Sequence, residues 1–178
     1  MPIDLTKLDP KLQQKLDQLL QSCRARGVEM RAYNGLRTPA EQAKLWRQSR
    51  PIEKIRQKID QLHAAGAHYL AGVLSAVGPA SGPHVTNSIP GFSWHQWGEA
   101  VDSFWLVDGD SEWSTDRLIN GLNGYQVYAN EAQKLGLTAG GLWPTFKDWP
   151  HVQLQAAGSP EGAMTLQQIN DEMQRRFG

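Results

Sequence analysis

Three side chains of this sequence have the types that a catalytic zinc site uses. His95 and Asp102 lie in the segment 93–102, and His151 follows Asp148 by three residues. Two imidazoles, one carboxylate and a water molecule form a catalytic zinc site in many hydrolases. Asp148 would add a further carboxylate that could act as a base. This combination indicates metal-dependent hydrolysis.

The spacing of these residues requires a turn between two kinds of local structure. Asp102 lies seven positions after His95, which is about 23 Å along a strand or roughly 10 Å along a helix. Neither spacing brings both side chains to one ion, so the chain must turn, and Gly98 is the natural position. Residues 100–107 then have the pattern of a strand, and 151–154 the pattern of a shorter one. Alternation along the first strand places four side chains on one face: Ala100, Asp102, Phe104 and Leu106. On the second strand, His151 and Gln153 share a face.

The composition limits the class of protein. The chain has 178 residues, 18 Lys and Arg against 18 Asp and Glu, and a pI near 7. We expect one domain over residues 1–178 with a substantial hydrophobic core. The even spread of charge does not indicate nucleic-acid binding, and no apolar stretch is long enough to span a bilayer. The first ten residues lack the apolar core of a signal peptide. The single cysteine, Cys23, is predicted to be a small core residue.

Helices and strands alternate irregularly along the chain, which predicts an α+β fold. Asp9 and Pro10 begin a helix that ends at Gly27, and residues 28–33 read as a strand. Thr38 and Glu41 form a capping box before a second helix, and a third helix begins at Pro51. Residues 66–91 are predicted to be a long loop, or a short helix followed by a loop. Two more helices are expected over 117–135 and 165–177.

Four motifs stand in a fixed order along the chain. They are Arg37-Thr38-x-x-Glu41-Gln42, Val85-Thr86-Asn87, Ser93-x-His95-x-x-Gly98-x-Ala100-x-Asp102 and Asp148-x-x-His151-x-Gln153. With these motifs the sequence resembles the M15 family of zinc peptidases, and within it the L-alanyl-D-glutamate endopeptidases of phage endolysins, over roughly two thirds of its length.

The resemblance implies a role for each matched position. His95, Asp102 and His151 match the zinc ligands, and Asp148 matches the catalytic carboxylate. Arg37 matches an arginine that binds substrate and stabilises developing negative charge, and Ser93 matches a serine that contacts substrate. Relatives often carry Trp-Gly-Gly-Asp-Trp before the last motif, where this chain has Ala139-Gly140-Gly141-Leu142-Trp143.

The same resemblance implies a function and a fold. We expect a small antiparallel sheet with flanking helices, of the hedgehog/DD-peptidase type, and one Zn2+ per chain. The expected activity is hydrolysis of a peptidoglycan stem peptide by an L-alanyl-D-glutamate endopeptidase. Two alternatives stay open, namely a D,D- or L,D-carboxypeptidase and a zinc-stabilised binding module without turnover.

The expected partners and location follow from the substrate. We expect a monomer that is made in the cytoplasm without a signal peptide. It would act on the cell wall after release by a partner such as a holin, or after delivery by a secretion apparatus. A role in binding nucleic acid or in spanning a membrane is not expected.

Structural roles compete with functional ones for several residues. Arg37 could be a surface charge beside a helix start, and Ser93 could close a turn. Asp148 could cap the turn before Pro150. Four tryptophans crowd the motifs and could line a substrate cleft or pack in the core: Trp94, Trp97, Trp143 and Trp149. Trp105 is predicted to be core, and His63, His68 and His84 are predicted to be solvated.

Overall fold

The computed structural model describes residues 3–178, and it divides the chain into two compact units. The first, the sheet unit, comprises Met1–Leu36 and Trp97–Ala156. The second, the helical unit, comprises Arg37–Gln96 and Ala157–Gly178. The expectation of one peptidase domain over the whole chain stays a prediction. The first ten residues, which are predicted to lack the apolar core of a signal peptide, include two that lie outside the described part.

The sheet unit contains five antiparallel strands around the central strand β2, Ala100–Val107. One edge of β2 pairs with β1, Glu29–Asn34. Its other edge pairs with β5, His151–Gln153, near the start of β2 and with β3, Asp110–Glu112, near its end. The two-residue strand β4, Thr138–Ala139, completes the sheet beside β5. The predicted α+β class and the small antiparallel sheet are therefore confirmed.

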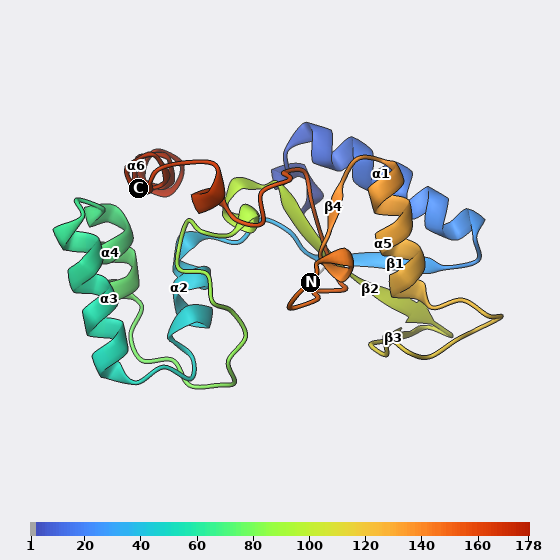
Figure 1. Ribbon diagram of the computed structural model, residues 1–178, viewed down its shortest axis with the longest axis horizontal. Helices are drawn as coiled ribbons and strands as arrows, with labels where there is room; N and C mark the ends of the chain where they lie inside the picture. The colour runs from blue at the N-terminus through green and yellow to red at the C-terminus, as the bar shows by residue number, and fades with distance from the viewer. Residues whose placement is uncertain (1–2) are drawn as a thin grey trace. The chain divides into compact units, whose positions relative to one another are not determined.

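One face of this sheet packs against two helices. These are α1, Pro10–Ala25, and α5, Gly124–Lys134, which lie beside each other over the strands (Figure 1). Leu12, Leu16 and Leu19 repeat along α1 at helical spacing, and all are buried. Val101 and Trp105 meet them from β2. Cys23 lies in the same core, as predicted, and burial raises the pKa of its thiol to about 12.

The opposite face of the sheet carries the predicted zinc ligands Asp102 and His151. Asp102 and Phe104 are absent from the core, whereas Val101 and Trp105 lie within it. The predicted alternation along β2 is thus confirmed. In β5, Val152 is buried in the core, so that His151 and Gln153 share the other face. Asp102 faces His151 in register, which places the two on one surface.

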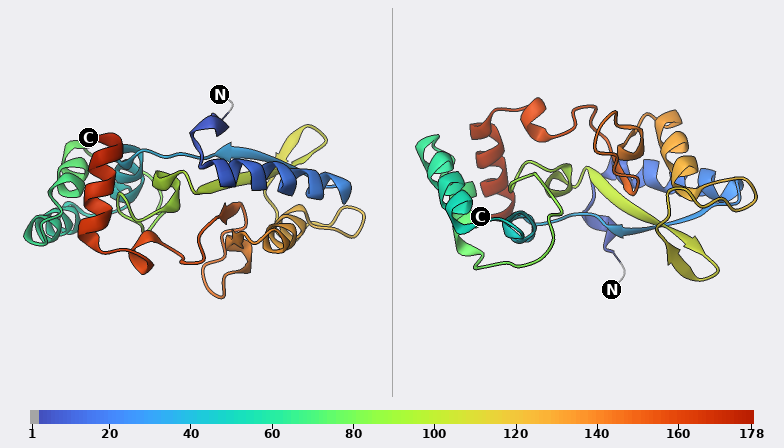
Figure 2. Two further views of the ribbon diagram at one scale, coloured as in Figure 1. Left: turned by 90° about the horizontal axis from the view of Figure 1, so that it is seen from above. Right: turned by 60° about the horizontal axis from the view of Figure 1, so that its bottom comes forward.

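The helical unit is built from four helices and two long connections. They are α2, Pro39–Arg47; α3, Ile52–Ala64; α4, His68–Ala76; and α6, Leu166–Phe177. Helix α6, red in Figure 2, packs along α4 through Ile169 and Met173. Capping boxes at Thr38 and Thr165 begin α2 and α6. The region 66–91 is the predicted short helix followed by a loop.

Short 3-10 turns link these elements at four places: Leu5–Lys7, Trp94–Trp97, Gly140–Leu142 and Pro160–Gly162. None of the helices in the described part is long and apolar enough to cross a membrane.

The prediction of one helix over 117–135 is wrong for its first seven residues. Helix α5 begins only at Gly124, and Asn123 caps it by accepting hydrogen bonds from the backbone N–H groups of Tyr125 and Gln126. Before the cap, Ile119 and Leu122 bridge across a tight turn. Asn120 and Gly121 form this turn with positive φ angles of 51° and 77°, a conformation that excludes a helix there.

Candidate active site

Asp102 and His151 lie opposite each other on neighbouring strands. Their Cα atoms pair in the β2–β5 ladder, and the His151 Nδ1 atom is 3.0 Å from the Asp102 Oδ1 atom. Both residues are buried. The sheet therefore supplies a rigid base for one imidazole and one carboxylate, because both side chains stand on adjacent backbones that are hydrogen-bonded to each other.

Two neighbouring amides fix the outer atoms of this pair. Asn34 donates through Nδ2 to the Asp102 Oδ2 atom at 2.7 Å. The Gln153 Oε1 atom lies 3.0 Å from His151 Nε2, while the Gln153 Nε2 group donates to the Gln155 carbonyl. Because the amide oxygen of Gln153 can only accept, His151 Nε2 carries the proton and donates it. Nδ1 is then the ring atom with a lone pair.

This arrangement leaves two electron-rich atoms facing each other. His151 Nδ1 and Asp102 Oδ1 are both acceptors when the ring is neutral, and they are 3.0 Å apart. Such a pair needs a cation, either a proton or a metal ion. Imidazole nitrogen and carboxylate oxygen are both good zinc donors. The hydrogen bonds that Asn34 makes to Asp102 and Gln153 makes to His151 are of the type that orients zinc ligands. The donor set therefore fits zinc.

The electrostatics of His151 point the same way. Burial lowers the pKa of its imidazole, but the hydrogen bond and charge of Asp102, the charge of Asp148 and the bond to Gln153 together raise it above its ordinary value. The anions around this ring outweigh the desolvation penalty. The surroundings of His151 thus favour positive charge.

Asp148 is held by its backbone close to His151. Its carbonyl accepts from the His151 backbone N–H at 3.2 Å, and its own N–H donates to the Gly140 carbonyl at 3.1 Å. The backbone therefore closes this turn, and the side chain is exposed. The sequence-based alternative, in which the Asp148 side chain caps the turn, gains no support from these bonds.

The glycine pair before this turn permits the close approach. A Cβ atom at Gly140 would collide with the Asp148 carbonyl, and one at Gly141 would collide with the ring of Trp149. Gly140 and Gly141 are the part of the Trp-Gly-Gly-Asp-Trp pattern that this chain keeps. Their role was missed from sequence alone, although the retained pair was the signal that could have indicated it.

In the helical unit, Arg37 is held at both its main chain and its side chain. Its backbone N–H donates to the His95 carbonyl at 3.2 Å, and its guanidinium donates to the Gln42 Oε1 atom at 2.9 Å. Gln42 is fully buried. It also donates to the Ser88 carbonyl at 2.7 Å and accepts from Gln96 at 3.2 Å. The reading of Arg37 as a plain surface charge does not account for this buried support.

Ser93 has a visible structural role in the turn that carries His95. Its hydroxyl oxygen accepts from the His95 backbone N–H at 3.4 Å, and its carbonyl accepts from the Gln96 backbone N–H at 3.0 Å. The Gln96 Oε1 atom accepts a hydrogen bond from the Ser93 backbone N–H at 3.2 Å. These bonds orient the turn that presents His95. The predicted contact of Ser93 with substrate stays a prediction.

Within residues 3–178, His95, Asp102 and His151 are the group of His, Cys, Asp and Glu side chains that could hold a metal ion, and all three are buried. These are the three residues that the sequence predicts as ligands, and their role in holding zinc stays a prediction. The other histidines lie on the surface, as expected. His63 and His68 are 3.1 Å apart between their Nδ1 atoms, and His84 lies 3.0 Å from Asn87.

The tryptophans divide between core and site. Trp94, Trp97 and Trp105 are buried. Trp143 is half-buried, and its ring lies 5.4 Å from that of His151 between centroids. Trp149 is also half-buried and packs against Gly141. Core packing is therefore the role of the first two motif tryptophans, whereas Trp143 borders the candidate site.

Comparisons with known proteins find peptidases that act on peptidoglycan. A relative from Bacillus subtilis (strain 168), the peptidoglycan L-alanyl-D-glutamate endopeptidase CwlK, is 26% identical over 157 residues, which are 86% of this chain and 77% of the relative. The L-Ala D-Glu endopeptidase ChiX of Serratia marcescens gives a TM-score of 0.44 at 20% identity, over 85% of this chain and 83% of ChiX.

A second solved structure is a variant of the vancomycin-resistance D,D-pentapeptidase VanY, from a VanB-type cassette, in complex with Zn(II). It gives a TM-score of 0.47 at 19% identity, over 91% of this chain and 83% of VanY. The family model described as VanY, D-alanyl-D-alanine carboxypeptidase, matches residues 5–138. The chain therefore belongs to this family of M15 peptidases and is a zinc-dependent peptidoglycan peptidase.

Proposed function

We propose that this peptidase is an L-alanyl-D-glutamate endopeptidase whose zinc is held by His95, Asp102 and His151. The observation that carries the site assignment is the pair of facing acceptors, His151 Nδ1 and Asp102 Oδ1, with the charge of Asp148 directed at the same imidazole. The endopeptidase activity is favoured by the relative CwlK, which bears that name and aligns with most of this chain.

Bound zinc would supply Lewis acidity and a lowered pKa for its water at neutral pH. Asp148 would accept the proton of the attacking water and later pass it to the leaving amine. A backbone hydrogen bond joins Asp148 to His151 across the turn, and it keeps the backbone of Asp148 in a fixed position beside His151. Asn34 and Gln153 would hold the ligand side chains in orientation.

Arg37 would stabilise the charge that develops on the scissile carbonyl. Its planar guanidinium can bind two oxygens at once, and the bond to Gln42 restricts its motion before substrate arrives. Donors that are already oriented stabilise a transition state more than donors that must first reorganise.

Two other activities are the competing outcomes. A D,D-carboxypeptidase is favoured by the description of the matching family, and an L,D-carboxypeptidase stays an alternative. A zinc-stabilised module without turnover is disfavoured by Asp148, because a purely structural zinc site has no use for an additional carboxylate beside a ligand.

Digestion of purified peptidoglycan by the zinc-loaded protein distinguishes these activities. Mass spectrometry should show peptides that begin with D-glutamate, together with muramoyl-L-alanine ends on the glycan. Release of D-alanine alone would replace the endopeptidase with a carboxypeptidase, and no cleavage would support the binding module. Asp148→Ala serves as the control, and it should retain zinc while turnover falls by a factor on the order of 10²–10⁴.

A further inference from the structure

The sheet face that carries Asp102 and His151 continues into a group of aromatic side chains. Phe104 follows Asp102 on this face of β2. Its ring centroid lies 6.1 Å from that of Tyr33 and 6.0 Å from that of Trp113. Tyr33 and Trp113 meet edge to face at 5.6 Å. We call these three rings the aromatic platform. All belong to the sheet unit, so one sheet carries both the platform and the two ligands.

The platform is exposed in a way that core aromatics are not. Tyr33 is 44% exposed and Trp113 is 53% exposed, whereas Trp105 on the other face is only 3% exposed. Exposed aromatic side chains that gather in one place mark binding surfaces more often than single exposed apolar residues do. The position beside two zinc-ligand candidates makes substrate the natural occupant.

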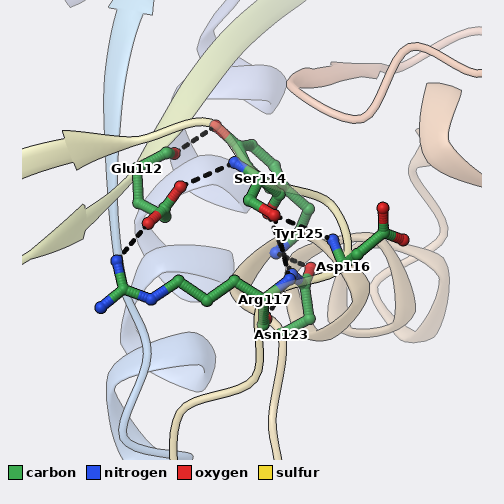
Figure 3. A network of polar contacts seen from close by, with 6 residues as sticks. All are labelled: Glu112, Ser114, Asp116, Arg117, Asn123 and Tyr125. Atoms are coloured by element: carbon green, nitrogen blue, oxygen red, sulfur yellow. Dashed lines mark hydrogen bonds and ion pairs between the residues drawn. The ribbon is translucent and has the colours of Figure 1, made fainter.

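A polar network involves the residues on both sides of Trp113, Glu112 and Ser114 (Figure 3). The Glu112 carbonyl accepts from the Tyr125 hydroxyl at 2.8 Å, and the Glu112 carboxylate accepts from the Ser114 N–H at 2.8 Å and from Arg117. Asn123 donates to the Ser114 carbonyl at 3.0 Å. The residues on both sides of Trp113 are thereby tied to the start of α5. A ring that is ordered before binding costs less entropy to use.

Arg31 and Glu112, which flank the platform, are each paired with an opposite charge. Arg31 is in register with Phe104, and it donates to the Glu29 carboxylate at 3.1 and 3.2 Å. Glu112 is paired with Arg117. The surface therefore offers ring faces and little net charge, which suits an uncharged sugar ring better than the acidic residues of a stem peptide.

We propose that the aromatic platform binds the N-acetylmuramoyl ring that precedes the stem peptide. The inference rests on the proposed endopeptidase function. Phe104 is two residues beyond Asp102, or about 7 Å along the strand. In an L-alanyl-D-glutamate substrate, one alanine and a lactyl group separate the scissile carbonyl from the sugar, a similar reach. In a D-alanyl-D-alanine substrate four residues and the lactyl group separate the scissile carbonyl from the sugar, about 17–18 Å, which is beyond the platform.

Kinetics on two matched substrates test the proposal. Both carry the same stem tripeptide, which is attached to N-acetylmuramic acid in one and to lactic acid alone in the other. The zinc-loaded protein should show a kcat/KM roughly 3- to 10-fold higher on the muramoyl substrate, the range expected for one good ring contact. Trp113→Ala should lower kcat/KM on the muramoyl substrate to the level of the lactoyl substrate, and Trp113→Phe should restore part of the preference.

Leu118→Ala is the matched control, because Leu118 is an apolar residue of the following loop that is 61% exposed and lies outside the platform. It should leave the preference unchanged. Equal kcat/KM on both substrates in the unmodified protein would overturn the proposal. So would an equal fall on both substrates in Trp113→Ala.

A binding measurement separates failure of this proposal from failure of the proposed function. The indole N–H signal of Trp113, assigned in NMR spectra with Trp113→Phe, is followed in the zinc-loaded Asp148→Ala variant to prevent turnover. Muramoyl dipeptide should shift this signal, and lactoyl dipeptide should not. If neither substrate is cleaved, the endopeptidase assignment fails, but a shift with muramoyl dipeptide alone would still support the platform. The absence of that shift would reject it.

Discussion

At the scale of single residues, hydrogen bonds to neighbouring side chains determine which atoms of His151 and Asp102 are left to bind a metal ion. Gln153 accepts a hydrogen bond from His151 Nε2, and Asn34 donates one to the Asp102 Oδ2 atom. The remaining atoms, Nδ1 and Oδ1, then face each other. The sequence predicts the ligands from their types and order, but it does not indicate which ring nitrogen binds. That choice depends on a neighbour that only the β5 backbone places.

Loss of Gln153 should therefore weaken zinc binding. Gln153→Leu removes the acceptor that fixes the His151 ring. Loss of a residue that hydrogen-bonds to a metal ligand costs about 10–100-fold in metal affinity. His151→Ala should lose most of the zinc. Competition with a chelator and elemental analysis measure both effects. Gln126→Ala, on the exposed face of α5, is the control. Unchanged affinity in Gln153→Leu would mean that the bond does not orient the ligand.

Arg37 makes a second prediction at this scale. Arg37→Ala should lower kcat by about 10²–10³ if the guanidinium acts on the transition state, and Arg37→Lys should be clearly impaired because an ammonium group lacks the planar fork. If Arg37 acts on substrate binding instead, KM should rise while kcat holds. Arg56→Ala, an exposed arginine of the same unit, controls for loss of charge. An unchanged kcat/KM in Arg37→Ala would remove Arg37 from the active site.

At the scale of elements, patterns in the sequence predict the strands that carry the ligands better than the loops that position Asp148. Period-two alternation places Asp102 on the correct face of β2 because one face must be buried. Capping signals at Thr38 and Thr165 locate two helix starts for a similar local reason. The beginning of α5 is missed because Asn120 and Gly121 make a turn inside an apparently helical pattern. The fit of Gly140 against Asp148 is missed because it joins segments that pairing of β4 with β5 brings together.

Gly140→Ala tests how closely that fit controls turnover. The added Cβ would meet the Asp148 carbonyl, so the turn before His151 must shift. We expect kcat to fall by at least tenfold, since small displacements of catalytic groups are costly, while the helical content seen by circular dichroism stays unchanged. Gly158→Ala is the control, because a Cβ there meets nothing within 4 Å. If Gly140→Ala keeps full activity, the backbone contact does not position Asp148.

Helix α6 should show a pH-dependent stability that comes from one carboxylate. Hydrogen bonds from Arg175 and Arg176 lower the pKa of Glu172 from 4.5 to about 2. A carboxylate whose pKa falls on folding stabilises the folded state above its unfolded pKa, and that stabilisation disappears as the pH drops from about 4.5 towards 2. Glu172→Gln should therefore lower the free energy of unfolding slightly at pH 7, by less than about 1 kcal/mol for a partly exposed pair. The difference from the unmodified protein should shrink at pH 3, and a constant difference would contradict this origin.

At the scale of the whole molecule, the proposed activity requires that the protein meet a substrate outside the membrane. Peptidoglycan lies beyond the cytoplasmic membrane, and the two units together carry every residue that the family motifs match. Damage to cells should therefore depend on where the protein is placed, not on how much of it is made. A holin or a secretion apparatus as the natural route stays a prediction.

Expression in a bacterial host with and without an added export signal tests this dependence. The chain without the signal should leave growth unchanged, because its substrate is out of reach. The exported chain should round or lyse the cells, since cleavage of stem peptides weakens the wall. Exported Asp148→Ala, at matched levels measured by immunoblot, should be harmless because it folds and binds zinc but does not turn over. Equal toxicity with and without export would indicate an intracellular target, and equal toxicity of exported Asp148→Ala would show that secretion itself is the cause.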